Sequence, residues 1–448
     1  MFKKILIANR GEIAIRIIRA CREMGIETVA VYSTADKDAL HTEMADEAIC
    51  IGAAKPSSSY LNMQNILSAT VLSGAEAIHP GFGFLSENSK FAEMCKECNI
   101  TFIGPDADSI DKMGNKSKAR EIMMSSGIPV VPGSQGAVSD VKEAMNIAEK
   151  IGYPVMVKAS AGGGGRGIRI IWNKSEFIKA FETAKSEAKG AFGDDTMYVE
   201  KFIESPRHIE FQILADNFGN TIYLGERDCS IQRRNQKVLE EAPSPVMTEE
   251  LRKEMGEAAV KAAKSVNYKN AGTIEFLYDK YGKYYFMEMN TRIQVEHPIT
   301  EMVTDIDLIK QQIKIAAGQM LEIKQQDIKI RGHAIECRIN AENPDEGFRP
   351  SPGKIKRLYV PGGPGIRLDS AAYNGYTIPP NYDSMIAKLI VHGDDREEAI
   401  AKMRRALWEF VVDGVDTNID FQFQIINNED FIEGKYDTGF ISKKLKIK

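Results

Sequence analysis

The sequence has few cysteines, no long apolar run and little excess of charge of either sign. Six cysteines in 448 residues do not indicate the disulfide framework of a small secreted protein. The chain, including its start MFKKILIANRGE, contains no apolar stretch long enough to cross a bilayer. The formal net charge of −5 gives no broad basic surface for nucleic acid. We therefore predict a reduced, cytoplasmic protein that binds neither nucleic acid nor membrane.

The sequence also lacks internal repeats, low-complexity tracts and a cysteine cluster with metal-ligand spacing. Cys95 and Cys98 form a C-x-x-C pair, but no second pair lies at ligand spacing. We interpret the segment FAEMCKECNI around them as the end of a helix. With 448 residues the chain is too long for one small core, so we expect two or three lobes.

Strand-like and helix-like segments alternate through the first hundred residues. Short apolar runs lie at 3–8, 27–33, 75–80 and 100–105. Segments with helical spacing of apolar residues separate them at 11–25, 60–74 and 88–98. This alternation predicts a parallel sheet that is covered by helices on both faces. The turn NRGE follows the first strand, but the dinucleotide fingerprint G-x-G-x-x-G is absent there, so a dinucleotide site in this lobe has little support.

A run of glycines in KASAGGGGRGIRII indicates close approach of the backbone to a ligand. Gly162, Gly164 and Gly167 satisfy G-x-G-x-x-G, but β-branched residues follow where a dinucleotide site would open a helix. A Walker loop would need Lys and then Ser or Thr after Gly167. The remaining interpretation is a glycine flap between two antiparallel strands, whose amides close over phosphates. Lys158 precedes the flap and could hold a phosphate as a point charge.

The sequence argues against two alternatives to this phosphate flap. Protein kinases use a glycine flap, but this sequence has no H-R-D or D-F-G motif. A hairpin tip without a ligand would need only one or two glycines to turn.

A second motif places two carboxylates on neighbouring strands. The stretch GTIEFLYDKYGKYYFMEMN reads as a hairpin, and if Tyr281 and Gly282 form its centre, Glu275 lies directly opposite Glu288. Their Cβ atoms would then be about 5 Å apart. Two like charges at that distance need a cation, and a hard divalent ion suits oxygen ligands. The polar residues also continue at a period of two, which predicts one polar strand face carrying Glu288, Asn290, Arg292, Gln294 and Glu296.

These motifs, taken together, resemble one known family. A glycine flap after a lysine, with a hairpin carrying E-M-N, is similar to the ATP-grasp fold. Within that fold, the chain resembles biotin carboxylase, the ATP-dependent component of acetyl-CoA carboxylase. The resemblance runs from Phe2 to the C-terminal helices and rests on the segments IANRGEIAIR, HPGFGFLSEN, KASAGGGGRG, ERDCSIQRRNQK, EMNTRIQVEHPITE and GHAIECRINAE.

The resemblance implies an α/β architecture with an ATP-grasp fold. An N-terminal Rossmann-like parallel-sheet domain would span 1–114, and a connecting helical segment 115–128. A mobile lid carrying the glycine flap would span 129–203. A mixed α+β part, comprising the rest of the ATP-grasp domain and the biotin carboxylase C-terminal domain, would span 204–448.

The implied activity is ATP-dependent carboxylation of biotin with bicarbonate, through carboxyphosphate. This is the first half-reaction of acetyl-CoA carboxylase in fatty acid synthesis; the alternative is a component of another acyl-CoA carboxylase or of pyruvate carboxylase. ATP is a substrate and Mg²⁺ or Mn²⁺ the metal. The chain ends KKLKIK without a carrier-like Met-Lys-Met segment, so we expect biotin on a separate carrier protein. Carboxyltransferase subunits are further expected partners.

The family's site residues map onto this sequence as three groups of binding residues. The implied ATP-binding residues are Lys116, Lys158, Gly164, Gly165, Glu200, Lys201, Phe202, Ile203, His208, Gln232, Asn235, Glu275 and Glu288. The implied metal ligands are Glu275, Glu288 and Asn290. The implied bicarbonate-binding residues are Lys237, Arg292, Gln294 and Val295.

The implied catalytic residues are Glu296, Arg292 and Arg338. Glu296 matches the general base for bicarbonate. Arg338 matches the residue that stabilises the ureido oxygen of biotin, and Phe82 lies in a loop that contacts biotin. The family usually has Tyr at position 82 and often His at position 235. The resemblance thus implies one hydrogen bond fewer at Phe82 and no charge at Asn235.

A homodimer is also implied by the resemblance. Arg19, Glu23 and Arg367 match interface positions of the family, whereas Pro364 stands where an aromatic residue is usual. The alternative for Arg19 and Glu23 is a solvated i,i+4 ion pair.

The sequence disfavours two rival functions. One is another ATP-grasp ligase that makes an acyl-phosphate for an amine, against which the RINAE and RIQVEH segments argue. The other is a nucleotide-sensing module without catalysis, which the presence of Glu296 and of the metal-ligand residues disfavours.

Overall fold

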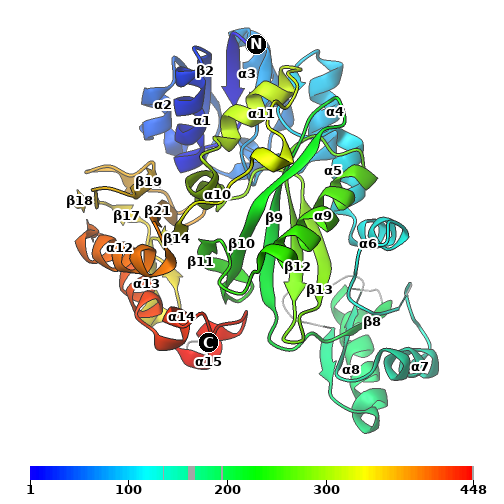
Figure 1. The fold of residues 1–448 in the computed structure, drawn as a ribbon. Helices are drawn as coiled ribbons and strands as arrows, with labels where there is room; N and C mark the ends of the chain where they lie inside the picture. The colour runs from blue at the N-terminus through cyan, green and yellow to red at the C-terminus, as the bar shows by residue number, and fades with distance from the viewer. Residues whose placement is uncertain (135, 160–166, 193–194, 446–448) are drawn as a thin grey trace. The chain divides into compact units, whose positions relative to one another are not determined.

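The computed structural model describes residues 1–134, 136–159, 167–192 and 195–445. The chain divides into two compact units. The first comprises Met1–Ile122, Arg207–Glu275 and Glu288–Lys448, and the second comprises Met123–Pro206 and Phe276–Met287. Helices and strands occur in both (Figure 1). None of the described helices combines the length and the apolar character that a membrane crossing requires.

The first unit begins with a parallel sheet of strand order β3-β2-β1-β4-β5. Each neighbouring pair of strands runs parallel, as between Lys4–Ile7 and Glu27–Ala30. The elements are β1 (Lys4–Ile7), α1 (Gly11–Glu23), β2 (Glu27–Ser33), η1 (Thr34–Asp36), α2 (Leu40–Met44), β3 (Glu47–Gly52), η2 (Pro56–Ser58), α3 (Met63–Ser73), β4 (Ala77–His79), α4 (Ser89–Glu97), β5 (Thr101–Phe102), α5 (Ala107–Gly114) and α6 (Lys116–Ser125).

Helices cover both faces of this sheet because successive β1 residues point to opposite sides. Ile5 and Ile7 pack in one apolar cluster with the buried stripe of α1. Leu6 and Ala8 pack in another cluster with α3 and α4. The predicted α/β arrangement is therefore confirmed. Strand β3 was not predicted, because only one of its six side chains is fully buried and its pattern is weak.

Side-chain caps fix where several helices begin. The side chains of Asn62, Asn88, Thr248, Asp307 and Asp395 each accept a hydrogen bond from a backbone N–H three residues further on. Such a cap satisfies one of the backbone donors that have no partner in the first turn. The helix that was expected around the cysteine pair is α4, and both Cys95 and Cys98 are free thiols.

An eight-stranded sheet forms the centre of the first unit, with strand order β13-β12-β9-β10-β11-β14-β21-β19. Helix α9 packs on β9 and β10. Cross-strand pairs bring Glu240 opposite Glu336 and Arg338 opposite Lys388. The elements are β9 (Arg207–Ala215), β10 (Thr221–Arg233), β11 (Gln236–Ala242), α9 (Glu249–Ser265), β12 (Asn270–Tyr278), β13 (Tyr284–Asn290), α10 (His297–Thr304), α11 (Leu308–Ala316), β14 (His333–Asn340), β19 (Ile366–Ser370), β21 (Met385–Gly393) and α12 (Arg396–Glu409).

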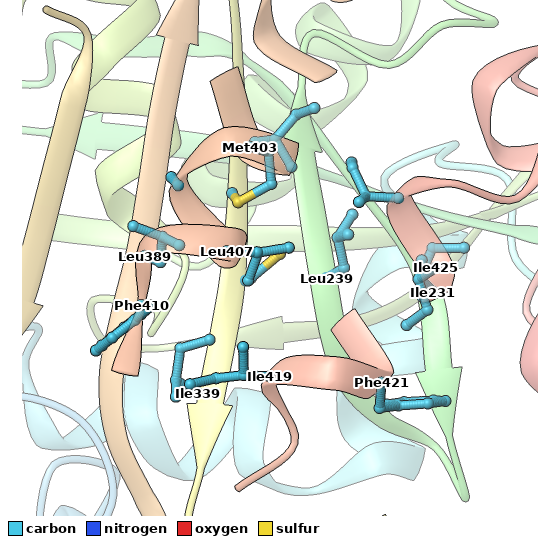
Figure 2. Close-up of a cluster of buried hydrophobic side chains, with 14 of the residues drawn as sticks. Ile231, Leu239, Ile339, Leu389, Met403, Leu407, Phe410, Ile419, Phe421 and Ile425 are labelled. Carbon is cyan, nitrogen blue, oxygen red and sulfur yellow. The ribbon is translucent and has the colours of Figure 1, made fainter. Parts of the chain in front are cut away.

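The two faces of β11, β14 and β21 differ in chemistry. On one face Leu239, Ile339 and Leu389 pack against α12 and α13 in a large apolar cluster, which Figure 2 shows. On the other face α10 packs through Ile299 and Val303. Because side chains alternate along a strand, this second face also carries Glu240, Glu336, Arg338 and Lys388. The remaining elements of this part are η3 (Gln325–Asp327), β15 (Glu342–Asn343), η4 (Pro344–Glu346), β16 (Arg349–Pro350), β17 (Gly353–Lys354), β18 (Arg357–Tyr359), β20 (Thr377–Ile378), β22 (Val411–Asp413), α13 (Ile419–Ile426), α14 (Glu429–Ile432) and α15 (Phe440–Lys444).

The second unit contains a three-stranded sheet of order β7-β6-β8, covered by two helices. Strands β6 and β7 are antiparallel, with Lys158 opposite Ile168. The predicted antiparallel strands on either side of the glycine run are therefore confirmed, whereas Gly162, Gly164 and Gly165 lie outside the described residues. The elements are α7 (Val141–Ile151), β6 (Val155–Ala159), β7 (Ile168–Ile171), α8 (Lys174–Phe192) and β8 (Met197–Lys201).

The turn of the β12–β13 hairpin differs from the prediction. The Asp279 N–H donates to the Lys283 carbonyl at 2.8 Å, and the Gly282 N–H donates to the Asp279 carbonyl at 3.2 Å. The loop therefore has three residues and is not centred on Tyr281 and Gly282. Gly282 adopts a φ of +80°, which glycine tolerates best. Counting outward from this turn therefore does not place Glu275 directly opposite Glu288.

The predicted polar strand face beyond Asn290 is wrong. Strand β13 ends at Asn290, and residues 291–296 form bends and turns. Glu296 is the N-cap residue of α10, and Pro298 occupies the first turn of that helix. Proline suits a first helical turn and cannot donate in a strand ladder, so the chain turns into a helix here.

A buried charge cluster on the same sheet supplies a stability prediction. The Glu241 carboxylate receives hydrogen bonds from His333, from Arg396 at 2.7 Å and from the Tyr436 hydroxyl. Burial alone would raise the pKa of Glu241, but His333 and Arg396 lower it to about 2 from an ordinary value of 4.5. A depressed pKa stabilises the fold above the unfolded pKa, by about 3 kcal/mol here, and that stability is lost as the pH falls from 4.5 towards 2.

We therefore expect Glu241→Gln to lower the free energy of unfolding by about 3 kcal/mol at pH 7. Urea unfolding of both proteins checks this. The difference between them should shrink as the pH falls below 4.5. An equal difference at pH 7 and in acid would show that the charge of Glu241 is not the cause.

Candidate active site

Lys237 on β11 is the central cation of a buried charged cluster. Its ammonium lies 2.5 Å from Glu210 Oε2, 3.0 Å from Glu275 Oε1 and 2.6 Å from Glu296 Oε1. These three carboxylates come from β9, β12 and the N-cap of α10, so strands far apart in the sequence meet here. The strand order β12-β9-β10-β11 places the strands of Glu275, Glu210 and Lys237 in one sheet.

The charges in this cluster shift one another's pKa values. Burial lowers the pKa of Lys237, but the neighbouring Cys229 and the carboxylates outweigh burial and raise it well above its usual value. Burial raises the pKa of Glu296, but Lys237, Arg338 and Arg227 outweigh burial and hold it well below the usual value. The cluster therefore keeps Lys237 charged and Glu296 ionised at neutral pH.

Glu275 is the second centre of the cluster and collects four polar groups. Its Oε1 accepts hydrogen bonds from Asn290 Nδ2 at 2.8 Å and from Gln294 Nε2 at 3.0 Å, besides that from Lys237. His208 Nε2 lies 2.9 Å from its Oε2. Burial raises the pKa of Glu275, but Lys237 and His208 outweigh it and lower the pKa strongly. Glu275 is thus a buried anion that can bind a cation.

Glu275 and the side chain of Asn290 could supply oxygen ligands to a hard divalent ion. Glu275 and Asn290 are in contact, and carboxylate and amide oxygens are the ligands that Mg²⁺ prefers. Glu288 is part-exposed and forms its ion pair with Lys116, at 3.4 Å. The ligand atoms of His208, Glu210 and Glu275 also lie within 4.8 Å of one another, so the described residues offer a further set of ligands around the same carboxylate.

Arg292 links the residues that follow β13. Its Nη1 donates to Gln294 Oε1 at 2.7 Å, and its Nη2 donates to Asn290 Oδ1 at 3.0 Å. Its Nε donates to Glu87 Oε2 at 2.9 Å. The Glu87 carboxylate also accepts from the backbone N–H of Thr291 at 3.1 Å. Glu87 therefore fixes both the bend after Asn290 and the direction of the guanidinium.

Arg338 on β14 bridges two buried carboxylates. Its Nε donates to Glu240 Oε1 at 2.7 Å, and its Nη2 lies 2.6 Å from the same oxygen. Nη2 also donates to Glu296 Oε2 at 3.0 Å. Both oxygens of Glu296 thus accept from a cation, one from Lys237 and one from Arg338.

Behind Val295 lies a lysine that is fully buried. Lys388 Nζ donates to the Val295 carbonyl at 2.8 Å and lies 3.2 Å from Glu12 Oε2. The ring centroid of Phe82 is 5.9 Å from this ammonium. Lys388 therefore fixes the backbone of Val295 and lies beside the loop that carries Phe82.

The polar residues on β10 are divided between the cluster and the surface. Gln232 Nε2 lies 2.8 Å from His208 Nδ1 and 2.8 Å from the Cys229 carbonyl, so it holds the imidazole in place. Asn235 lies exposed at the tip of the β10–β11 hairpin with a φ of +63°. Asparagine tolerates this left-handed conformation better than histidine's bulkier side chain, which gives Asn235 a backbone role at this turn.

In the second unit, Lys158 and Glu200 form an ion pair at 2.7 Å across β6 and β8. Lys201 Nζ donates to the carbonyls of Gly152 and Tyr153. The backbone N–H of Lys201 donates to the Pro132 carbonyl at 2.7 Å, and that of Phe202 donates to the Pro154 carbonyl at 3.0 Å. These two amides are therefore engaged within the unit.

Two of the three residues expected at a dimer interface have partners within the chain. Glu23 pairs with Lys310 at 2.6 Å. Arg367 pairs with Glu301 and Asp369, each at 2.8 Å. Arg19 is exposed on α1.

Sequence reasoning missed several charged groups of the site. Glu210 accepts from Arg227 and from Lys237. Glu87 orients Arg292, and Glu240 orients Arg338. A signal for Glu210 existed in the segment RHIEFQ, where polar residues alternate with apolar ones in a fully buried strand. Buried charges in a strand need partners, so this pattern could have indicated the site.

Three family models match the chain in succession. The model of the biotin carboxylase N-terminal domain matches residues 1–110. The model of the ATP-binding domain of the carbamoyl-phosphate synthase L chain matches residues 115–324. The model of the biotin carboxylase C-terminal domain matches residues 336–443.

Similar proteins cover almost the whole chain. Biotin carboxylase 1 of Bacillus subtilis (strain 168) is 61% identical over 442 residues, which are 98% of each chain. A pyruvate carboxylase component from Methanothermobacter thermautotrophicus is 58% identical over 443 residues, covering 99% of this chain and 90% of that one. The crystal structure of the biotin carboxylase domain dimer of Hydrogenobacter thermophilus 2-oxoglutarate carboxylase, in complex with MgADP, ADP and bicarbonate, has a TM-score of 0.92 and 54% identity, with 100% and 98% of the two chains covered. On the fold, the site and these matches, the chain belongs to the biotin carboxylase family.

Proposed function

We propose that this chain carboxylates biotin in an ATP-dependent reaction, with bicarbonate as the source of carbon and with biotin attached to a separate carrier protein. The observation that carries this proposal is the position of Glu296. One buried carboxylate accepts from Lys237 on one oxygen and from Arg338 on the other. Lys237, which is proposed to bind bicarbonate, and Arg338, which is proposed to act on biotin, therefore donate to the same candidate base.

Bicarbonate binding is assigned to Lys237, Arg292, Gln294 and the backbone of Val295. A small anion suits this region because Lys237 and Arg292 supply the cations that would hold it in line with the γ-phosphate of ATP. Arg292 is already oriented by Glu87, and Val295 by Lys388. Oriented donors of this kind lose little entropy when the anion binds.

Glu296 is proposed as the general base that takes the bicarbonate proton. In the structure described, its pKa is held well below the usual value, which makes it a weak base. A bound bicarbonate would offer Lys237 a further acceptor besides its three carboxylates and so weaken its hold on Glu296. The pKa of Glu296 would then rise towards the range in which proton transfer is efficient.

The metal ligands are proposed to be Glu275, Glu288 and Asn290. A bound Mg²⁺ or Mn²⁺ would neutralise charge on the nucleotide phosphates. The chain's contribution is to keep Glu275 ionised, through Lys237 and His208. Lys116 lies beside Glu288 and is assigned to the phosphates.

ATP itself is the substrate for which the largest set of residues is proposed. Beyond the metal ligands and Lys116, the proposed contacts are Lys158, Gly164, Gly165, Glu200, Lys201, Phe202, Ile203, His208, Gln232 and Asn235. Adenine recognition through the backbone at 200–203 falls to the Ile203 amide and to carbonyl oxygens, because the Lys201 and Phe202 amides are engaged. We also propose the domain division 1–114, 115–128, 129–203 and 204–448, with 129–203 as the lid.

The second half of the proposed reaction concerns biotin. Carboxyphosphate breaks down to CO₂ and phosphate, and the phosphate removes the proton from biotin N1′, which then attacks CO₂. Arg338 is assigned to the oxyanion that develops on the ureido oxygen, and Phe82 to packing against biotin. Carboxyphosphate hydrolyses in water, which is the physical reason for a closing lid.

The final acceptor is proposed to be acetyl-CoA, within an acetyl-CoA carboxylase of fatty acid synthesis that also has carboxyltransferase subunits. The resemblance of segments such as KASAGGGGRG and EMNTRIQVEHPITE to the ATP-dependent component of acetyl-CoA carboxylase favours this assignment. A pyruvate or 2-oxoglutarate carboxylase is the alternative, because relatives with those names match almost as well.

We also propose a homodimer, by analogy with the dimer named for the Hydrogenobacter domain. Arg19, Glu23 and Arg367 are the proposed interface residues. Sedimentation at micromolar concentration should give a dimer, and a monomer throughout that range would exclude it.

ATP hydrolysis by the purified chain tests the proposed function. Hydrolysis should require bicarbonate and should rise when free biotin is added, with carboxybiotin as a product. Hydrolysis that needs an amine and no bicarbonate would favour the acyl-phosphate ligase. ATP binding without any turnover would favour a nucleotide sensor.

A further inference from the structure

Two carboxylates meet beneath Arg338 in the interior of the sheet. Glu240 on β11 is directly paired with Glu336 on β14 in the antiparallel register. Both side chains have 0% exposed surface. Directly paired residues of antiparallel strands have Cβ atoms about 5 Å apart, within reach of a hydrogen bond between the carboxyl groups.

Most oxygens of these two carboxyl groups receive no hydrogen bond within the described part of the chain. Oε1 of Glu240 accepts from Arg338. Among the described residues, no donor reaches Oε2 of Glu240 or either oxygen of Glu336. An ionised carboxylate without a partner is very costly to bury, so one carboxyl group here must carry a proton.

The cations near Glu336 are occupied elsewhere. Arg338 donates to Glu240 and Glu296. Lys388 donates to the Val295 carbonyl and pairs with Glu12. With the nearest cations occupied in this way, Glu336 is the carboxyl group that gains least from ionisation.

Glu240, in contrast, is the oxygen acceptor that orients Arg338. Both Nε and Nη2 of Arg338 reach its Oε1, so the guanidinium is held from one edge. If the Glu240 carboxylate could rotate, it would hold the guanidinium of Arg338 less firmly. A hydrogen-bond donor to Oε2 of Glu240 would prevent this rotation.

We propose that Glu336 keeps its proton at neutral pH and donates it to Oε2 of Glu240, so that the pair forms a singly charged unit that positions Arg338. Glu240 and Glu336 are positioning residues and touch no substrate. The consequence for biotin rests on the function proposed above for Arg338, whereas the shared proton does not.

Burial and charge support this assignment. Burial raises the pKa of Glu336 well above its usual value, against the opposing effects of Lys388 and Arg338. Burial also raises the pKa of Glu240, but Arg338 acts against burial and favours its ionised form. Glu296 raises both further, because a third carboxylate nearby disfavours another negative charge.

Infrared spectroscopy tests the proton without reference to activity. The parent protein at neutral pH should show the C=O stretching band of buried protonated carboxyl groups, and this band should be weaker in Glu336→Gln by the contribution of one group. Glu336→Gln should also keep the parent's unfolding midpoint in urea, since an amide has the size and neutrality of a protonated carboxyl. Glu241→Gln is the matched control on the neighbouring strand position: it removes a carboxylate that is ionised, and it should lower the midpoint clearly. An identical spectrum for the parent and Glu336→Gln would overturn the proposal.

A donor-deletion series tests the positioning role. Glu336→Met fills the space without a donor, whereas Glu336→Gln retains an N–H. Carboxybiotin formation by Glu336→Met should fall by about 10-fold or more, because small misplacements of an oriented group cost this much. Bicarbonate-dependent ATP hydrolysis without biotin should fall much less, and Glu336→Gln should restore carboxybiotin formation. Equal loss in both variants, or equal loss of both activities, would refute positioning through a shared proton. If the parent protein forms no carboxybiotin, the proposed function fails instead, and the infrared result still decides the proton.

Discussion

Glu296→Ala is expected to abolish bicarbonate-dependent ATP cleavage, with or without biotin. Loss of a general base typically costs about 10²- to 10⁴-fold. The structure adds a second reason, because Glu296 is the shared partner of Lys237 and Arg338. Glu296→Gln is the better matched variant, since it keeps the size of the side chain and should show the same loss. Initial rates of phosphate release with saturating ATP measure the effect.

Arg338→Gln should differ in kind from these variants. If Arg338 acts on the biotin oxyanion, carboxybiotin formation should fall by about 10²-fold or more, the typical cost of one oxyanion donor. Slow bicarbonate-dependent ATP hydrolysis should largely remain. Removal of the cation also raises the pKa of Glu296, which favours its action as a base. Equal loss of both activities in both variants would mean that the two residues merely hold the cluster together.

Glu275→Gln and Glu288→Gln should each severely weaken the use of Mg²⁺-ATP. Metal-ion stabilisation of a phosphoryl transfer contributes several kcal/mol, so we expect a loss of about 10²- to 10³-fold in rate. The double variant should be little worse than either single one, because residues that act as a unit are not additive. Glu257→Gln, which removes an exposed carboxylate on α9, is the control.

Metal binding gives this prediction a second readout. Electron paramagnetic resonance of Mn²⁺ with a non-hydrolysable ATP analogue should show weaker binding in both single variants. Strictly additive losses, or unchanged Mn²⁺ binding by Glu288→Gln, would mean that the two carboxylates do not share an ion. The second outcome would favour the alternative set of His208, Glu210 and Glu275.

The parts of the fold that the sequence predicted are those with local patterns. The N-terminal alternation depends on short apolar runs and helical spacing, and these packed as expected on both sides of β1. The strands on either side of the glycine run were predicted for the same reason. Local patterns suffice where an element buries one clear face.

The alternation of polar and apolar residues after Asn290 gave a wrong strand prediction, because a bent segment can show the same alternation as a strand. A period of two suits a strand, but the segment bends and then enters α10 at Pro298. Its polar side chains still meet, since Asn290 and Gln294 both donate to Glu275. Convergence of these groups depends on the bend, which hydrophobic periodicity does not encode.

The charged partners of the site could not be deduced from spacing. Glu240 and Glu336 are 96 positions apart, and only the β11–β14 pairing unites them. Glu210 reaches Lys237 through the order β9-β10-β11. Such contacts depend on strand order and register, which a single sequence determines only through long-range pairing.

The central claim is that bicarbonate attacks the γ-phosphate of ATP before biotin is carboxylated. Bicarbonate labelled with heavy oxygen tests it most directly, because carboxyphosphate leaves one bicarbonate oxygen on the phosphate when it releases CO₂. Mass spectrometry of the phosphate formed by the purified chain, with ATP, Mg²⁺ and free biotin, should find one labelled oxygen per molecule, and Glu296→Ala should form almost none. Phosphate without label, released at the full rate in the presence of bicarbonate, would contradict the mechanism.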